Sequence, residues 1–305
     1  MALVISNGMN IFTYSNFYLA LAVSLILLSV GSIIVFGLTL GIDFTGGSIM
    51  EVQYTESRPS TQDIQARLMD LELGSLQIQP VGEQNVLVRM KDIEENMHQE
   101  VLSLLGKEVQ ELRFESIGPV IGRELTKKTF LITVLSLLVL VSYIAFAFRK
   151  VTHPVHPWHW PLASLLALVF DLMVPLGVFA LFGKLEGMEL SIPVVVALLT
   201  VLGYSINNNI VVFDRVRENV FKNKGLGMQE VMNISIKQTL SRNLNTSLCT
   251  LFPVLAIFFF GGETLRAFSL VLGVGIVAGL YSSILLSPPF LLKMVDPSTR
   301  TQGQH

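Results

Sequence analysis

Three amide side chains stand next to one another inside an apolar stretch of the chain. Asn207, Asn208 and Asn209 lie within 190–213, whose other residues are mostly apolar. Hydrocarbon offers amide donors and acceptors no partner, so such residues are costly on a lipid-facing helix. Three consecutive positions sweep about 200° of a helix. Most of this helix must therefore face protein or a water-filled cavity, and polar groups at membrane depth indicate a functional site.

A carboxylate and a guanidinium could take part in proton transfer beside these amides. Asp171 lies inside the apolar stretch 161–182, and no other such stretch has an acidic residue in its middle. An ionised carboxylate there is costly unless it is paired, so Asp171 is either protonated or hydrogen bonded within the bundle. A structural role and a proton-carrier role are both open. Tyr204 and Thr200 precede Asn208 at four-residue spacing, which makes one polar stripe.

Arg242 begins a second polar stripe. Helical spacing places several other polar residues on the same face of its segment: Gln238, Thr239, Asn245, Thr246, Cys249 and Thr250. One interpretation is an arginine that reaches the water interface along its own stem. The alternative is a polar face that conducts protons or gates a path. We favour the second, because so many polar side chains would be wasted on lipid.

The composition shows what kind of protein must hold these groups. Of 305 residues, 51% are hydrophobic and 14% are charged, and the mean hydropathy is +0.60, which is typical of a polytopic membrane protein. A net charge of −2 without a basic patch argues against nucleic-acid binding. The single cysteine, Cys249, excludes an internal disulfide. We expect no enzyme activity, no cofactor and no metal, since there is no Walker-type motif and prolines separate His153, His156 and His159.

Six apolar stretches are each long enough to cross a bilayer. These stretches are 17–40, 130–148, 161–182, 190–213, 243–261 and 266–293. A long loop at 214–242 joins the fourth to the fifth, and tails at 1–16 and 294–305 flank the set. The first lacks a basic n-region and a cleavage site, so we interpret it as a retained helix. Lysine and arginine gather in the 214–242 loop, which predicts a cytoplasmic position for it. Both termini are then cytoplasmic, in a multi-pass protein of the cell membrane.

The segment 41–129 has the composition of a soluble domain, and the topology places it outside the cell membrane. Its patterns alternate as strand 48–54, helix 59–73, strands 76–80 and 85–90, helix 92–105 and strand 109–117. This β-α-β-β-α-β order predicts a ferredoxin-like sandwich in an α+β domain. The predicted fold class is therefore a six-helix membrane protein with an exported α+β domain between the first and second helices.

Two motifs carry a resemblance to a known family. One is the run Gly41, Ile42, Asp43, Phe44, Thr45, Gly46 and Gly47; the other combines Gly203, Tyr204, Ser205, Ile206 and Asn207 with Asp214, Arg215, Arg217, Glu218 and Asn219. Weaker matches are 117–122, 238–242 and 260–262. Together they resemble the SecF subunits of the bacterial Sec translocase, in the SecD/SecF family of the RND superfamily. The resemblance extends from Gly41 to the last helix.

The resemblance implies a fold and a function. It implies an RND-type fold that pairs with SecD and uses the proton-motive force to help unfolded polypeptides finish crossing the membrane. Implied partners are SecD, the SecYEG translocon, YajC-like and YidC-like accessory proteins, the translocating chain and the bilayer. The energy source is then the proton gradient, without a bound cofactor.

This chain has an amide at the position of the family's proton-relay carboxylate. The family places its relay carboxylate directly after the asparagine that matches Asn207, and this chain has Asn208 there; the relay arginine falls on Arg242. An amide cannot bind and release a proton near neutral pH. The substitution could be deliberate, a partner's carboxylate could act while Asn208 holds Arg242, or coupling could be lost or altered. Asp171 is then the chain's own best candidate for a titrating group.

Each motif also has a plainer interpretation. The run 41–47 could be only a helix exit and tight turn, which is compatible with a hinge for the domain. Asp214, Arg215, Arg217 and Glu218 could be a solvated helix end, or they could brace the cytoplasmic mouth. Two other functions remain open: half of another RND-type pump for a small lipophilic substrate, or a passive membrane assembly scaffold.

Overall fold

A computed structural model describes residues 11–55, 58–106, 109–149, 155–223 and 225–295. Most of the predicted tails, 1–16 and 294–305, therefore lies outside the described residues, as does His153. The chain divides into two compact units, one of residues 40–131 and one of residues 1–39 together with 132–305.

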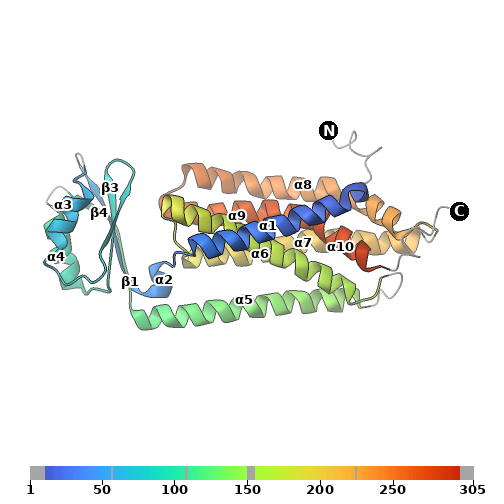
Figure 1. Ribbon diagram of the computed structural model, residues 1–305, viewed down its shortest axis with the longest axis horizontal. Coiled ribbons are helices and arrows are strands. Elements are labelled where there is room, and N and C mark those ends of the chain that lie inside the picture. The colour runs from blue at the N-terminus through green and yellow to red at the C-terminus, as the bar shows by residue number, and fades with distance from the viewer. Residues whose placement is uncertain (1–10, 56–57, 107–108, 150–154, 224, 296–305) are drawn as a thin grey trace. The chain divides into compact units, whose positions relative to one another are not determined.

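The unit 40–131 contains a two-layer α+β sandwich. Its order along the chain is β1 (Gly47–Tyr54), α3 (Thr61–Leu68), β2 (Gln77–Val81), β3 (Asn85–Met90), α4 (Glu95–Leu105) and β4 (Val109–Ile117). The strands pair antiparallel in the order β2-β3-β1-β4, and α3 and α4 lie side by side on one face of the sheet (Figure 1). This is the predicted ferredoxin-like topology. Alternate residues of the strands, such as Val52, Val86 and Val88, pack on Ile64 and Val101 of the helices, and all are fully buried.

The run 41–47 packs against the start of α5 (Pro119–Phe148) within this unit. Ile42–Thr45 forms the single helical turn α2, and Gly46 ends it at a φ of 75°. A Cβ on Gly46 would lie 2.7 Å from the Cα of Pro119. Gly122, one turn further along α5, would meet the backbone of Gly46 at 2.9 Å. The glycines are required both for the left-handed conformation and for the close backbone approach.

The other unit contains the membrane bundle. Six helical spans of the described chain are long and apolar enough to cross a membrane, namely Ile11–Phe36, Pro119–Phe148, His159–Glu186, Ile192–Lys222, Met228–Phe260 and Leu265–Met294. They comprise α1 (Ser15–Phe36), α5, α6 (His159–Glu186), α7 (Ile192–Lys222), α8 (Met228–Phe260), and a last span made of α9 (Glu263–Tyr281), a π-turn (Ser282–Leu286) and α10 (Ser287–Met294). The prediction of six helices is confirmed.

Several helices extend beyond the predicted limits. The expected loop 214–242 is mostly helical, because α7 continues to Lys222 and α8 begins at Met228. Hydropathy marks where a helix leaves the hydrocarbon, but the backbone stays helical while inward-facing residues such as Val216 and Asn219 find partners. Likewise α5 begins at Pro119, eleven residues before the predicted 130–148.

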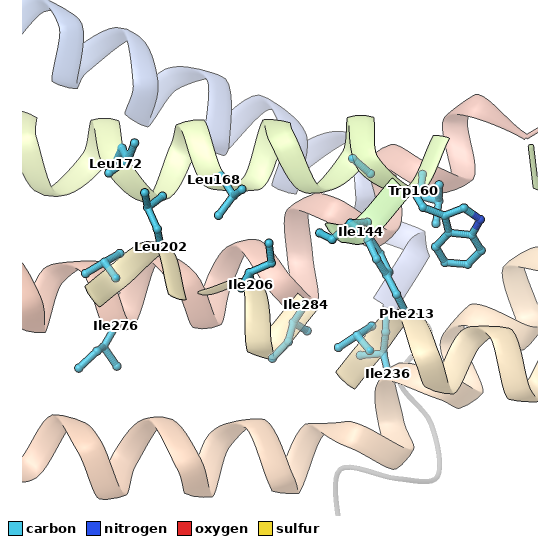
Figure 2. Packing of buried hydrophobic residues seen from close by; sticks show 14 of the residues in the cluster. Ile144, Trp160, Leu168, Leu172, Leu202, Ile206, Phe213, Ile236, Ile276 and Ile284 are labelled. Carbon is cyan, nitrogen blue, oxygen red and sulfur yellow. The ribbon is translucent and has the colours of Figure 1, made fainter. Parts of the chain in front are cut away.

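The bundle core lies where α6, α7 and the last span meet. Leu168 and Leu172 of α6 point toward Leu202 and Ile206 of α7 (Figure 2). Glycines allow α9 to approach α7 closely: a Cβ on Gly275 would lie 2.1 Å from a methyl group of Val201. This close contact of small residues on the last span therefore lies inside the bundle.

Aromatic rings join the ends of α5, α6 and α7. Phe148 stacks on Trp160 at 5.0 Å between ring centroids, and Phe213 meets Trp160 edge-on at 5.1 Å. Trp160 is fully buried, whereas Trp158, two residues earlier, is 71% exposed. The sequence pattern could not tell the two apart.

Candidate functional site

Asp171 is fully buried on α6 and is held by two serine hydroxyls. Ser205 of α7 donates a short hydrogen bond to Asp171 Oδ2, and Ser282, the first residue of the π-turn, donates to the same oxygen at 2.8 Å. Asp171 Oδ1 is also buried and has no hydrogen bond within the described residues. A carboxylate in this setting can accept a proton on either oxygen. It is therefore the bundle's candidate proton-binding group.

Further polar residues extend this site to the other end of the π-turn. Asn209 of α7 donates from Nδ2 to the backbone carbonyl of Ser205 at 3.3 Å and accepts at Oδ1 from the Ser287 hydroxyl at 2.5 Å. The Ser287 N–H donates to the Ser282 carbonyl, which is the i→i+5 bond of a π-turn. These contacts close a loop through Asp171, Ser205, Asn209, Ser287 and Ser282, which we call the Asp171 ring. All five residues are 0% exposed.

A second polar zone lies between α7 and α8. The Tyr204 hydroxyl donates to Ser247 Oγ at 2.9 Å. Asn208, one turn along α7, and Asn243, one turn back along α8, are both buried, and the Nδ2 of each has no hydrogen bond within the described chain. Since the helices run antiparallel, this register places Asn208 and Asn243 at one level. Unpaired buried amide donors cost free energy.

Arg242 points away from the bundle. The buried line of α8 consists of Ser235, Thr239, Asn243 and Ser247, whereas an outer polar face consists of Arg242, Asn245, Thr246 and Cys249, all exposed. This corrects the predicted single stripe, because Thr239 belongs to the buried line and the others do not. No ion pair or side-chain hydrogen bond of Arg242 is found in the described part of the chain. Arg242 precedes Ser247 by five residues, which is about 7.5 Å along the axis of α8. Because Ser247 contacts Tyr204 and the two helices are antiparallel, Arg242 lies near the level of Asn209 and so close to the level of the Asp171 ring.

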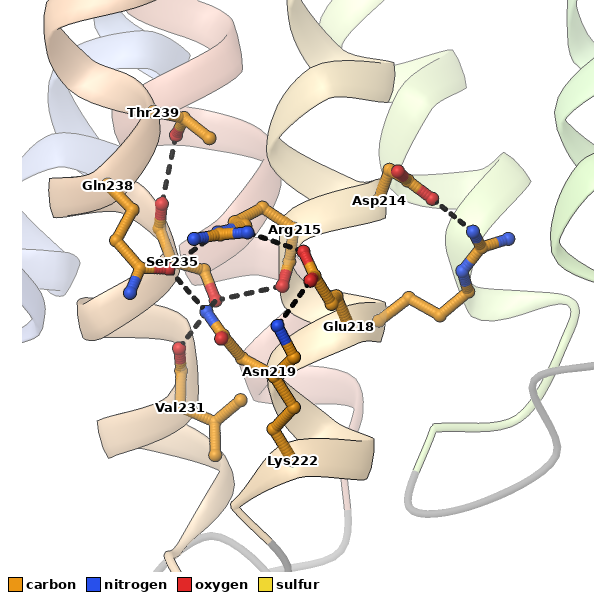
Figure 3. A network of polar contacts seen from close by, with 10 residues as sticks. Asp214, Arg215, Glu218, Asn219, Lys222, Val231, Ser235, Gln238 and Thr239 are labelled. Atoms are coloured by element: carbon orange, nitrogen blue, oxygen red, sulfur yellow. Dashed lines mark hydrogen bonds and ion pairs between the residues drawn. The ribbon is translucent and has the colours of Figure 1, made fainter.

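The predicted charged motif forms a joint between α7 and α8 (Figure 3). Gln238 Oε1 accepts from Arg215 at 2.6 Å and from Asn219 at 2.8 Å, and Asn219 also donates to Ser235 at 2.8 Å. Glu218 pairs with Arg215 and with Lys222, while Asp214 pairs with Arg217. Asn219 is buried and the charged groups are partly exposed. The motif thus holds two helix ends together.

The predicted coupling residues do not form one hydrogen-bonded group. Among the described residues no hydrogen bond joins Asp171, Asn208 and Arg242 to one another. Asn207 is exposed on α7, next to the buried Asn208 and Asn209. Sequence reasoning did not identify the four residues that form the ring with Asp171, namely Ser205, Asn209, Ser282 and Ser287. Two of them gave a signal, because Asn209 is an amide at membrane depth and Ser205 lies in the family motif.

Six membrane-length helices, a ferredoxin-like domain after the first of them and a buried carboxylate in the bundle define a membrane protein of RND type. The model of the SecD/SecF protein export membrane protein C-terminal region matches residues 97–296, and the SecD/SecF GG motif matches residues 31–57. The chain belongs to the SecD/SecF family of protein translocase subunits.

Individual relatives agree with this assignment. Protein translocase subunit SecF of Thermobaculum terrenum is 39% identical over 286 residues, which cover 88% of each chain, and that of Anaerolinea thermophila is 36% identical over 90% of this chain and 91% of the relative. The crystal structure of SecDF from Thermus thermophilus, a translocon-associated membrane protein, superposes with a TM-score of 0.82 at 32% identity. That match covers 95% of this chain and 39% of the SecDF chain.

Proposed function

We propose that this chain acts with a SecD-type partner and uses the proton-motive force to help exported polypeptides complete their passage across the membrane. The observation that carries the partnership is the outer polar face of α8. Arg242 has no charge partner in the described chain, yet it lies near the level of the buried carboxylate. A guanidinium at that depth needs a carboxylate or a water path, and a partner subunit can supply either.

The relatives support the same proposal. SecDF of Brucella abortus matches this chain at 33% identity over 264 residues, which are 33% of its own length. A single polypeptide there contains much more than the part that matches this chain. The remaining part is where we look for the SecD-type partner, whose helices would cover Arg242. On this proposal the complete assembly, and not this chain alone, contacts the SecYEG translocon, accessory proteins and the unfolded polypeptide.

The coupling ion would be handled inside this chain by Asp171. The site needs no bound cofactor, because a carboxylate takes up and releases protons directly. Positive residues around the joint of α7 and α8 support a cytoplasmic position for that end, and in this orientation both termini would be inside and the 40–131 unit outside. Movement of that unit against a translocating chain would be the work performed.

Rescue of protein export tests this proposal. A strain depleted of its own SecF receives the cognate SecD with the chain as given, with Asn208→Asp, with Arg242→Lys or with Arg242→Ala. We expect rescue by the chain as given and by Arg242→Lys, and loss with Arg242→Ala. If only Asn208→Asp rescues, coupling depends on a carboxylate at position 208 and the role of Asp171 is wrong. If no version rescues despite normal membrane expression, the proposed function is wrong.

A further inference from the structure

The π-turn Ser282–Leu286 has a geometric consequence for the Asp171 ring. In a regular α-helix, five residues rotate by about 500°, so Ser282 and Ser287 would point about 140° apart. The i→i+5 bond from the Ser287 N–H to the Ser282 carbonyl brings the two serines onto one side. One can then contact Asp171 at 2.8 Å while the other contacts Asn209 at 2.5 Å.

The two serine hydroxyls that donate to Asp171 differ in the other acceptors within their reach. The Ser282 hydroxyl lies 3.2 Å from the Gly279 carbonyl as well as 2.8 Å from Asp171 Oδ2. A hydroxyl has one hydrogen and two lone pairs, so Ser282 can donate to only one of these acceptors at a time. No second acceptor is found for the Ser205 hydroxyl among the described residues. Ser282 is therefore the hydroxyl that can reverse its direction.

We propose that Ser282 is the positioning residue that lets Asp171 exchange a proton without losing a hydrogen bond, and that the π-turn exists to present it. This rests on the proposed function of Asp171 as the proton-binding group. With Asp171 ionised, Ser205 and Ser282 both donate to Oδ2. When a proton from the transport path binds Oδ2, the Ser282 hydroxyl turns to Gly279 and its lone pair accepts the new Asp171 O–H. The reverse turn accompanies proton release.

Proton binding also changes how firmly the ring is held. Hydrogen bonds to an ionised carboxylate are roughly twice as strong as neutral ones. Neutralising Asp171 therefore weakens its bonds to α7 and to the π-turn, while the Asn209–Ser287 contact is unaffected. Since the turn is tied at one end to Asp171 and at the other to Asn209, loosening the first tie frees the turn to shift. The ring thus converts a proton into a backbone change between α7 and the last span.

Few other ionisable groups face Asp171. The elements packed on α6 are α1, α7, α9, the π-turn and α10. The membrane-level parts of these elements carry only tyrosines as titratable residues, namely Tyr18, Tyr204 and Tyr281. Their charged residues lie toward helix ends, and these are Asp214, Arg215, Arg217, Glu218, Lys222, Glu263, Arg266 and Lys293. Tyr281 donates to the Tyr18 carbonyl at 2.7 Å and so is directed elsewhere. Proton uptake within the ring is thus assigned to Asp171.

Infrared difference spectroscopy tests the proposal on the full chain with its SecD-type partner in lipid nanodiscs. Spectra are recorded between high and low pH, and the carboxylic C=O band of Asp171 is assigned by its loss in Asp171→Asn. In Ser282→Ala we expect this band to move to higher frequency, because a hydrogen bond is lost. In Ser282→Thr, which keeps the hydroxyl, the band should return to its original frequency. Ser283→Ala is the matched control, because this buried hydroxyl bonds to the Leu280 carbonyl of its own helix at 3.1 Å.

A second measurement needs no substitution at Ser282. Hydrogen exchange of a peptide that covers 282–287, corrected for the intrinsic effect of pH, should speed up when Asp171 is protonated, whereas a peptide that covers 267–275 should not change. The same peptide in Asp171→Asn should lose this pH response. An unshifted band in Ser282→Ala, or unchanged exchange at 282–287, overturns the inference but leaves Asp171 as proton carrier. Absence of any Asp171 band at every pH overturns both.

Discussion

At the scale of single residues, the proposed function depends on one carboxylate, Asp171, in a fully buried position where an ionised group is costly. Asp171 has two serine donors on one oxygen, and no cation of the described chain contacts it. A buried carboxylate that was needed only for structure could be replaced by an amide of the same shape. A proton carrier could not, because an amide does not titrate near neutral pH.

We therefore predict that Asp171→Asn abolishes the response of export to the proton-motive force. Export is measured in inverted membrane vesicles with and without an uncoupler, and the ratio of the two rates should fall to about one. Glu186→Gln is the matched control, since Glu186 is the other carboxylate of α6 and pairs with Arg266 at 3.3 Å. An uncoupler-sensitive Asp171→Asn variant would show that the proton binds elsewhere.

The sequence identified the costly residues but not their partners. Asp171 and the three asparagines stand out because nothing else in their stretches is so polar. Serines occur throughout the apolar stretches and often bond to their own helix, as Ser164 and Ser269 do here. Ser282 and Ser287 therefore gave no signal, and Ser205 stood out only as a member of the family motif. The sequence also could not predict that the Arg242 side chain points away from the bundle. That direction depends on which face of α8 meets α7, and both faces carry polar residues.

At the scale of elements, the joint between α7 and α8 illustrates how two buried amides can differ. Asn219 and Asn208 lie on the same helix and are 3% and 2% exposed. Asn219 Nδ2 makes two hydrogen bonds at 2.8 Å, to Ser235 and Gln238, whereas Asn208 Nδ2 makes none within the described chain.

We predict that Asn219→Ala destabilises the protein by about 1–3 kcal/mol, because the Ser235 and Gln238 groups lose a buried partner. Asn208→Ala removes the same volume and an unpaired donor, and should cost clearly less. Midpoints of thermal unfolding in detergent measure the difference. Equal losses for the two variants would mean that side-chain volume, and not hydrogen bonding, holds this joint.

The Gly46 contact leads to a prediction for the 40–131 unit. Gly46→Ala introduces a Cβ 2.7 Å from the Pro119 Cα at a φ of 75°, so strain and clash add, and we expect a loss of at least about 1–3 kcal/mol. Gly82→Ala is the control for strain alone, because its φ is 61° and no atom lies within 4 Å of the added Cβ. Limited proteolysis monitors unfolding of the unit, and the unit should be cleaved markedly faster in Gly46→Ala. Similar behaviour of both variants would exclude a packing role for this glycine.

Elements were predictable in kind but less so at their ends. The strands of the sandwich fall within one residue of their predicted ranges, and burial alternates most clearly along β3. The π-turn was not predicted, although Pro288 and Pro289 lie just beyond it, after Ser287. Prolines lack an N–H, so the α-helical ladder is already interrupted there, and an i→i+5 turn costs less. The two consecutive prolines just beyond the turn were the available signal.

At the scale of the whole molecule, the outer polar face of α8 is the surface on which we propose that the partner binds. Arg242, Asn245, Thr246 and Cys249 are exposed on a helix that crosses the membrane. Hydrocarbon cannot satisfy a guanidinium and an amide. A SecD-type subunit that packs here would bury them in protein. The lone cysteine of the chain lies on this face, so it reports directly on the contact.

We predict that the cognate SecD-type partner protects Cys249 from N-ethylmaleimide. The detergent-solubilised chain is labelled alone and in the purified complex, and the rate should fall at least about tenfold in the complex, because the thiol moves from a micelle surface into a packed interface. Cys249→Ser gives the background. Ile34→Cys in that background is the control, because Ile34 is 77% exposed on α1. Protection at position 34 with unchanged labelling of Cys249 would place the partner on α1, and Arg242 would then need water, not a subunit, as its neighbour.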